Sequence, residues 1–287
     1  MTDIRDQAVQ LYDAYTHEHR DRRRLLREMA AVAGSVAAAE VLIAGIGASP
    51  AAAAVIAPDD KRLRTETRTI GALTGYLAQP RRARARRPAV LVIHENRGLN
   101  DHIRDVARRV ALAGFVAFAP DYLAGAGGTP ADQDQARTLI GQLDLGAAIA
   151  STVATMNGAL AAKDGPRRIG AVGFCWGGAF VNRLAVAVGP ALAAGVSYYG
   201  PAPAPAEAAK VSAPLMIHLP GKDARVAATV EPWAAALTAA GKRVDFHRYP
   251  GVDHAFNNDT SAERYDRAAA ELAWSRSMAF LKRELDA

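Results

Sequence analysis

The chain has a single cysteine, Cys175, among its 287 residues. No disulfide can therefore form within the chain, and a metal site built on paired cysteines is excluded. An unpaired thiol is either buried and inert or positioned to react, so the sequence around Cys175 decides between these two interpretations.

Aromatic residues are also sparse, at 6% of the chain, although the formal net charge is +6. Much of the excess positive charge lies in the arginine run at 81–87, between Pro80 and Pro88. Base-stacking aromatic residues do not interleave with these arginines. The run is therefore interpreted as a solvated turn, and no nucleic-acid partner is expected.

A strongly apolar run long enough to span a membrane is likewise missing. Residues 30–57 contain one ionisable group, Glu40, but consist mostly of Ala, Gly and Val and include Pro50. Such weakly apolar residues predict no stable membrane insertion. Before this stretch, residues 4–29 place apolar side chains at helical spacing among charges, which predicts one amphipathic helix.

Residues 1–57 therefore have two interpretations. Arginines 22–24, followed by Leu25, Leu26 and Arg27, resemble a twin-arginine export signal, and alanines 51–54 could supply its cleavage site. In that case the protein is exported to the periplasm. The alternative is a helical arm that stays on a cytoplasmic protein, where it packs on the main domain or mediates a homodimer. We expect the cytoplasmic location and keep export as the alternative.

Residues 58–287 are expected to form one α/β domain. Segments 62–69 and 72–78 alternate apolar and polar residues around Gly71, which predicts an antiparallel hairpin. Continuous apolar runs then alternate with helical patterns, as in a mostly parallel sheet with helices on both faces. The runs lie at 89–94, 116–120, 168–174, 193–199, 214–219 and 244–249.

The strongest local signal is the segment GFCWGG at 173–178, which lies where a strand should end and a helix begin. Gly173 and Gly177 allow the tight turn that holds a nucleophile at this position. The start of the helix also favours a thiolate on Cys175. Taken alone, the segment would equally suit a phosphate-binding turn or a cysteine packed in the core.

Two later strands are followed by suitable catalytic partners. Asp223 comes shortly after the run 214–219, and His254 follows the run 244–249. The chain order nucleophile, acid, base is that of the α/β-hydrolase fold, which we therefore predict, preceded by the helical arm. His254 would accept the thiol proton, Asp223 would orient the imidazole, and Cys175 would form an acyl-enzyme that water resolves.

Four separated motifs together resemble the dienelactone hydrolase family. They are Glu95 after the first apolar run, the GFCWGG turn, YYG at 198–200 and DHAF at 253–256, and the resemblance covers residues 63–281. It implies hydrolysis of a carboxylic ester or lactone, of the carboxymethylenebutenolidase type. It also implies that Glu95 contacts the resting thiol and controls its ionisation, with a salt bridge to Arg97 or Arg104 as the alternative role. No metal or organic cofactor is expected.

The oxyanion of the acyl transfer needs two backbone donors. The N–H of Trp176, directly after the nucleophile, should be one of them, and the resemblance implies that Asn96 supplies the other. Two arginines that bind the substrate carboxylate in the family are replaced here by Gly125 and Asn258. The candidate substrate-binding residues are Arg97, Tyr122, Tyr199 and Phe256.

Two other functions are compatible with parts of the sequence. One is a non-catalytic α/β-hydrolase-fold module for binding or assembly, which would be expected to have lost a triad residue. The other is a nicotinamide-dependent oxidoreductase that uses the glycine-rich turn. The strand after that turn ends in YYG at 198–200 rather than in an acidic residue for a ribose, which disfavours the oxidoreductase.

Overall fold

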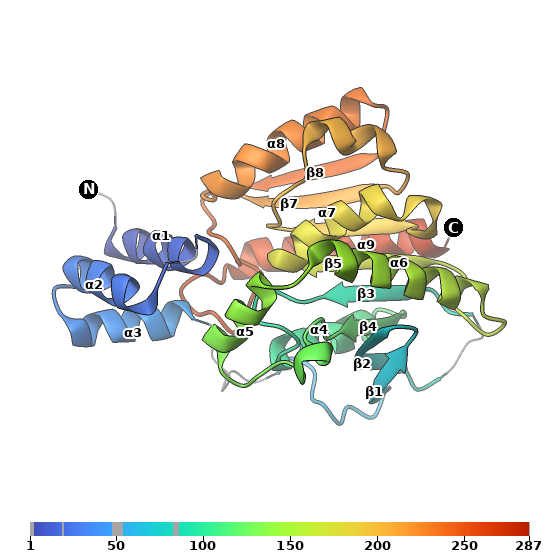
Figure 1. The fold of residues 1–287 in the computed structure, drawn as a ribbon, viewed down its shortest axis with the longest axis horizontal. Coiled ribbons are helices and arrows are strands. Elements are labelled where there is room, and N and C mark those ends of the chain that lie inside the picture. Colours follow the sequence, from blue (N-terminus) through green and yellow to red (C-terminus); the bar gives the residue numbers. More distant parts are fainter. Residues whose placement is uncertain (1–2, 19, 48–53, 83–85, 287) are drawn as a thin grey trace.

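The computed structural model describes residues 3–18, 20–47, 54–82 and 86–286. Its core is an eight-stranded sheet with the order β1-β2-β4-β3-β5-β6-β7-β8 (Figure 1). The strands are β1 (Leu63–Ile70), β2 (Leu73–Pro80), β3 (Ala89–Ile93), β4 (Val116–Pro120), β5 (Ile169–Phe174), β6 (Ala194–Tyr198), β7 (Leu215–Pro220) and β8 (Val244–Tyr249).

Among the described residues, the first three helices precede the sheet, and the later helices alternate with its strands as expected. They are α1 (Ile4–His17), α2 (Arg22–Ala33), α3 (Val36–Ile46), α4 (Asp101–Leu112), α5 (Gln133–Gly141), α6 (Leu145–Ala161), α7 (Trp176–Ala187), α8 (Ala224–Ala239) and α9 (Arg267–Asp286), with the short 3-10 helices η1 (Ala124–Ala126), η2 (Gly189–Ala191) and η3 (Pro205–Lys210).

The strand pairing confirms the predicted α/β architecture. Strands β1 and β2 form the expected antiparallel hairpin, β2 also pairs antiparallel with β4, and the other pairs are parallel. Alternate residues of β3 face opposite layers: Val90 and Val92 pack with α4 and α9, whereas Leu91 and Ile93 pack with α6, α7 and α8. Both faces of the central strands are thus covered, which explains their unbroken apolar sequences.

The N-terminal arm, residues 4–46, forms three helices with an apolar cluster of its own. The prediction of one helix over 4–29 is wrong, because the chain breaks between α1 and α2. Asp21 accepts a hydrogen bond from the backbone N–H of Arg24 at 2.8 Å and so starts a second helix. The buried members of the cluster are Ala8, Val9, Tyr12, Tyr15, Leu25, Met29, Ala39 and Ile46.

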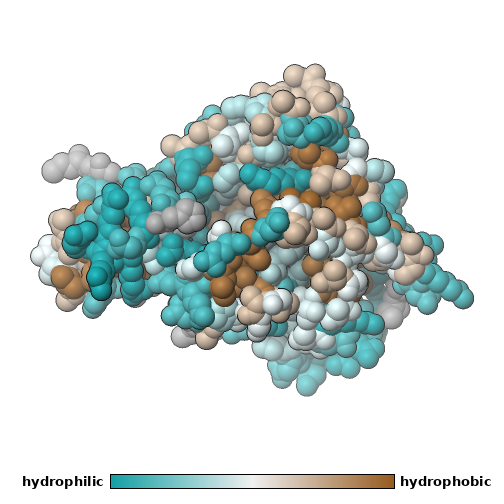
Figure 2. Space-filling model, in the orientation of Figure 1, coloured by the Kyte–Doolittle hydropathy of each residue, from teal (hydrophilic) through white to brown (hydrophobic). Residues whose placement is uncertain are grey.

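The arm lies beside the end of the sheet at which β3 finishes (Figure 1). Its visible outer surface is mostly hydrophilic, whereas apolar surface gathers on the body of the molecule (Figure 2). Within the described ranges, no single helix has the length and apolarity to cross a membrane. Two sharply bent helix pairs, α2 with α3 and α5 with α6, meet these criteria only in combination.

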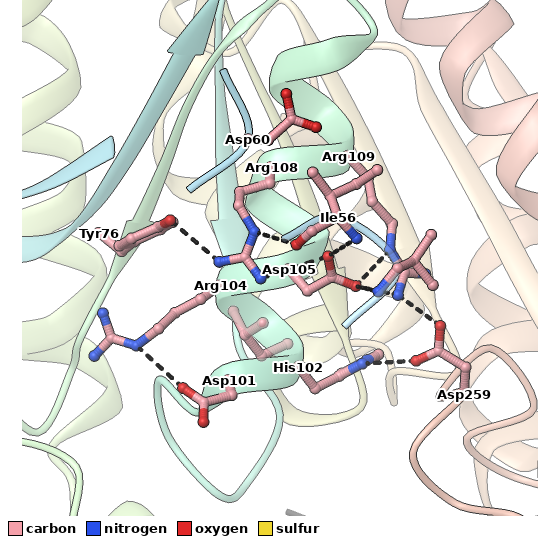
Figure 3. Close-up of polar contacts among 12 residues, drawn as sticks. Ile56, Asp60, Tyr76, Asp101, His102, Arg104, Asp105, Arg108, Arg109 and Asp259 are labelled. Atoms are coloured by element: carbon pink, nitrogen blue, oxygen red, sulfur yellow. Dashed lines mark hydrogen bonds and ion pairs between the residues drawn. The ribbon is translucent and has the colours of Figure 1, made fainter. Parts of the chain in front are cut away.

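A buried carboxylate on α4 ties three distant segments together (Figure 3). Asp105 accepts hydrogen bonds from the backbone N–H groups of Val55 and Ile56, at 3.1 and 2.8 Å, where the chain leaves the arm. Asp105 also pairs with Arg109, whose guanidinium reaches Asp259 at 2.6 Å in the loop after His254. The loop that carries the predicted catalytic base is thus anchored on α4.

Asp259 itself is stabilised as a carboxylate. Burial would raise its pKa, but the contact with His102, 3.1 Å away, and the positive charge of Arg109 outweigh this and lower the pKa to about 2. Because this pKa lies below the usual value, the stabilisation is complete above pH 4 and is lost as the pH falls towards 2.

The substitution Asp105→Asn should lower the free energy of unfolding by about 3 kcal/mol, because it leaves the buried Arg108 without its carboxylate partner and the half-buried Arg109 with Asp259 alone. Urea unfolding followed by circular dichroism measures the change. Asp101→Asn, on the exposed start of the same helix, is the matched control and should cost at most about 1 kcal/mol. Equal effects of the two substitutions would contradict the anchoring role.

Candidate active site

Cys175 occupies a strained turn between β5 and α7. Its backbone has φ 54° and ψ −112°, a conformation that residues with a side chain rarely adopt. A Cβ atom on Gly173 would lie 2.0 Å from the carbonyl oxygen of Gly177, and one on Gly177 would lie 2.2 Å from that of Ile93. Strand and helix therefore approach so closely that only glycine fits on either side of the thiol.

The structure brings Asp223 and His254 together with Cys175. Asp223 follows β7 and precedes α8, where one carboxylate oxygen accepts the backbone N–H of Val226 at 2.9 Å. The other oxygen lies 2.6 Å from Nδ1 of His254, on the loop after β8. Nε2 of His254 is buried and has no hydrogen-bond partner among the described residues. The sulfur of Cys175 lies within 4.8 Å of a ring nitrogen of His254.

The electrostatics of the three side chains favour an ion pair. Burial disfavours a charged His254, but the negative charge of Cys175 and the hydrogen bond to Asp223 outweigh it and raise the pKa of His254 to about 10. Burial would also raise the pKa of Asp223, yet the contact with His254 lowers it. At neutral pH the imidazole is therefore protonated and forms an ion pair with the Asp223 carboxylate.

Glu95 is buried next to this group and is held by two donors. Asn258 donates to Oε2 at 2.9 Å, and the Tyr199 hydroxyl donates to Oε1 at 3.4 Å. The alternative role of a salt bridge to Arg97 or Arg104 is wrong, because neither arginine pairs with Glu95 within the described ranges. Arg104 pairs with Asp101, and Arg97 bonds Tyr12 and Gln133. No hydrogen bond joins Glu95 to Cys175 here, so their resting-state contact stays a prediction.

The predicted oxyanion donors come from two segments that border the cavity of Cys175. Trp176 is the first residue of α7, and Asn96 belongs to the loop after β3. Both residues line the same cavity as Cys175. The ring of His94 stacks on Trp176 with centroids 5.3 Å apart, and its Nδ1 lies 2.7 Å from the Glu95 carbonyl oxygen. His94 therefore supports this loop.

A cavity of about 590 Å³ opens above Cys175. Leu143 and Leu145 give it an apolar side, while Arg137 and Arg225 bring positive charge. One terminal nitrogen of Arg225 is buried 3.6 Å from the Asp223 carboxylate and has no hydrogen-bond partner in the part of the chain that the structure describes. Neither arginine was singled out from the sequence, because each lies on a helix with no motif around it.

The predicted substrate-binding residues lie at different distances from this space. Arg97 lines a second, much smaller cavity beside Cys175 and bonds Tyr12 and Gln133. Tyr199 faces Glu95, as described above. Tyr122 donates to or accepts from Thr152 at 2.9 Å, and Phe256 is buried in the core, so neither lines the two cavities around the thiol.

One residue from the arm, His17, joins the site, which sequence reasoning did not foresee. Its ring meets that of His254 edge-on, with centroids 4.6 Å apart. Burial and the nearby charge of His254 hold the pKa of His17 well below its usual value, so the ring is neutral at neutral pH. The ring nitrogens of His17 and His254 and the Cys175 sulfur lie within 4.8 Å of one another. Imidazole nitrogen and cysteine sulfur are ligands that a soft divalent cation can bind. The expectation that the protein uses no cofactor therefore stays a prediction.

The sequence of this chain is similar to those of known hydrolases. The model of the dienelactone hydrolase family matches residues 73–285. A "Putative carboxymethylenebutenolidase" of Escherichia coli K12 is 30% identical over 254 residues, which cover 82% of this chain and 93% of the relative. A "Putative hydrolase fragment YghX" of the same organism is 53% identical over 74 residues, 26% of this chain and 63% of the fragment.

Solved structures agree with the sequence comparison. A "Putative Dienelactone Hydrolase" from Klebsiella pneumoniae superposes with a TM-score of 0.68 at 28% identity, covering 77% of this chain and 99% of that one.

The first prediction from this site concerns the turn itself. Gly173→Ala should lower the free energy of unfolding by about 3 kcal/mol or more, because the new methyl group meets a backbone carbonyl that cannot move aside. Gly158→Ala, inside α6 with open space around its Cα, should instead raise it by about 0.5–1 kcal/mol. Urea unfolding of both variants checks the contrast, and an unaffected Gly173→Ala would refute it.

The second concerns the ion pair. Since the pKa of His254 is raised to about 10, Cys175 should react with iodoacetamide at a rate that hardly changes between pH 7 and 9. An ordinary thiol with a pKa of about 8.5 instead speeds up about tenfold per pH unit below that value. His254→Asn should restore this steep rise, as measured by mass spectrometry. A steep rise in the unmodified protein would mean that the pair does not form.

Proposed function

Because this chain is a hydrolase of the dienelactone hydrolase family, we propose that it cleaves a carboxylic ester or lactone through an acyl-enzyme on Cys175. The observation that carries the proposal is the buried Cys175, His254 and Asp223 group at the carboxyl ends of β5, β8 and β7. The raised pKa of His254 supports it, because a protonated imidazole beside the sulfur can donate its proton to the leaving oxygen.

In the first half of the reaction, the Cys175 sulfur attacks the acyl carbon and forms a C–S bond. The carbonyl electron pair moves to oxygen, and the backbone N–H groups of Trp176 and Asn96 stabilise this oxyanion. When the carbonyl forms again, the C–O bond to the alcohol breaks and His254 protonates the leaving oxygen. Asp223 keeps the imidazole oriented with its Nε2 towards this oxygen.

In the second half, the neutral His254 removes a proton from water, and the resulting hydroxide attacks the thioester carbon. Collapse of the second oxyanion breaks the C–S bond, so that the sulfur leaves with the bonding electron pair, the carboxylic acid is released, and His254 keeps the proton that it took from water. With a lactone, the alcohol and the acid are parts of one product molecule. No metal or organic cofactor takes part in these steps.

We place the substrate in the cavity of about 590 Å³. Its leucines suit a short apolar skeleton, and Arg137 and Arg225 suit an anionic substituent. Relatives bear the name carboxymethylenebutenolidase, which describes a lactone with a carboxylate group. This class of substrate is consistent with the arginines, although they lie at other positions than Gly125 and Asn258.

The test is the pair Cys175→Ala and Cys175→Ser, assayed on short p-nitrophenyl esters and on five-membered lactones. Cys175→Ala should lower kcat by about 10³-fold or more, because no nucleophile is left to form the acyl-enzyme. Cys175→Ser should keep the fold and lose most activity, since His254 is tuned to a thiolate. Circular dichroism of both variants confirms folding. Full activity of Cys175→Ala on a proven substrate would refute the mechanism.

A further inference from the structure

The arm contributes a wall to the active site. Helix α1 ends at His17, and the last two residues of the helix, Thr16 and His17, line both cavities that adjoin Cys175. The region that matches the family begins only at residue 73. This wall is therefore supplied by a segment outside the matched part of the chain.

The beginning of α1 is ion-paired to the loops that carry the triad. Asp6 accepts from Lys222 at 2.9 Å, and Lys222 directly precedes the catalytic Asp223. Arg5 pairs with Asp253 at 3.2 Å, and Asp253 directly precedes His254. Each of the two catalytic loops is thus connected to the arm through the residue next to its functional side chain.

The end of α1 is fixed around the cavities. Asp13 pairs with the buried Arg264 at 3.3 Å, and the Tyr15 hydroxyl donates to Asp134 at 2.7 Å. Arg137 donates to the carbonyl oxygen of Tyr15 at 3.1 Å. The side-chain amide of Asn96, on the oxyanion loop, donates to the carbonyl oxygen of Thr16 at 3.3 Å. His17 is therefore held in place from several sides.

His17 borders both cavities around the thiol, one of about 590 Å³ and the other a remnant of about 10 Å³. Glu95, Arg97 and Arg264 line the remnant together with His17 and Cys175. A ring nitrogen of His17 lies within 4.8 Å of the Cys175 sulfur, so the imidazole takes up space directly beside the reacting atom. Only the larger cavity has the volume for a substrate bonded to Cys175.

We propose that His17 is a specificity-determining residue, whose ring limits the active site to substrates that are slender next to the reacting carbonyl. The proposal rests on the proposed function for its meaning in catalysis. Esters branched at the carbon next to the carbonyl need space on both sides of the sulfur, and His17 occupies one of these sides. Shortening His17 joins the two cavities and admits such esters.

The first experiment does not require ester hydrolysis. Cys175 is the only thiol in the chain, so its alkylation by the small iodoacetamide and by the bulky N-phenylmaleimide can be followed by intact mass. In His17→Ala the rate with the maleimide relative to iodoacetamide should rise about tenfold or more over the unmodified protein. His17→Phe restores bulk without an imidazole and should keep the ratio low.

Gln10→Ala, at an exposed position of the same helix, is the control and should leave the ratio unchanged. An unchanged ratio in His17→Ala overturns the proposal. A His17→Phe variant that behaves like His17→Ala overturns it as well, because bulk would then not be the property that matters.

The second experiment tests the same role of His17 by measuring ester hydrolysis. The ratio of kcat/KM for p-nitrophenyl pivalate to that for p-nitrophenyl acetate should rise about tenfold in His17→Ala and stay low in His17→Phe. If no variant hydrolyses either ester, the proposed function fails, while the alkylation ratio still decides whether His17 is the wall. If both esters are hydrolysed with an unchanged ratio, the role of His17 in selection is refuted.

Discussion

The close approach of backbone to backbone around Cys175 is the constraint on which the active site depends. Glycine at 173, 177, 178 and 200 lets β5, β6 and α7 come within distances at which a side chain would collide with a carbonyl group. The thiol consequently projects from the edge of the sheet with its φ at 54°. Asp223 and His254 can reach it because parallel neighbours deliver their loops to that same edge. The close packing around Cys175 thus places the thiol where the other two side chains can reach it.

Much of the body of the molecule was predictable from local sequence. Strand β5 is apolar throughout, and β7 is apolar except for His218, because both faces of each strand are buried. Runs of this kind can be recognised without knowledge of their neighbours. The order of Cys175, Asp223 and His254 likewise follows from the succession of strand ends. These features depend on residues that lie close together in the sequence, so the sequence carries them directly.

The parts that were missed depend on contacts between distant segments. Asp21 caps the start of α2 and so separates it from α1. The spacing of the apolar residues on both sides of Asp21 equally suits one continuous helix, which is why the break was missed. His17 reaches His254 across more than 200 positions, and Asn258 reaches Glu95 across 163. The local sequence around these residues gives no signal of such contacts. They follow from how the arm and the loop after β8 pack, which is a property of the tertiary structure.

The presence of a single cysteine has a consequence for the redox chemistry of the protein. If a peroxide oxidises Cys175 to the sulfenic acid, no second thiol in the chain can trap it as an internal disulfide. Its reduction then depends on a small thiol that enters by the route of the substrate. Because Thr16 and His17 of the arm line the cavities beside the sulfur, these two residues also border the path by which a reductant would reach Cys175 before further oxidation becomes irreversible.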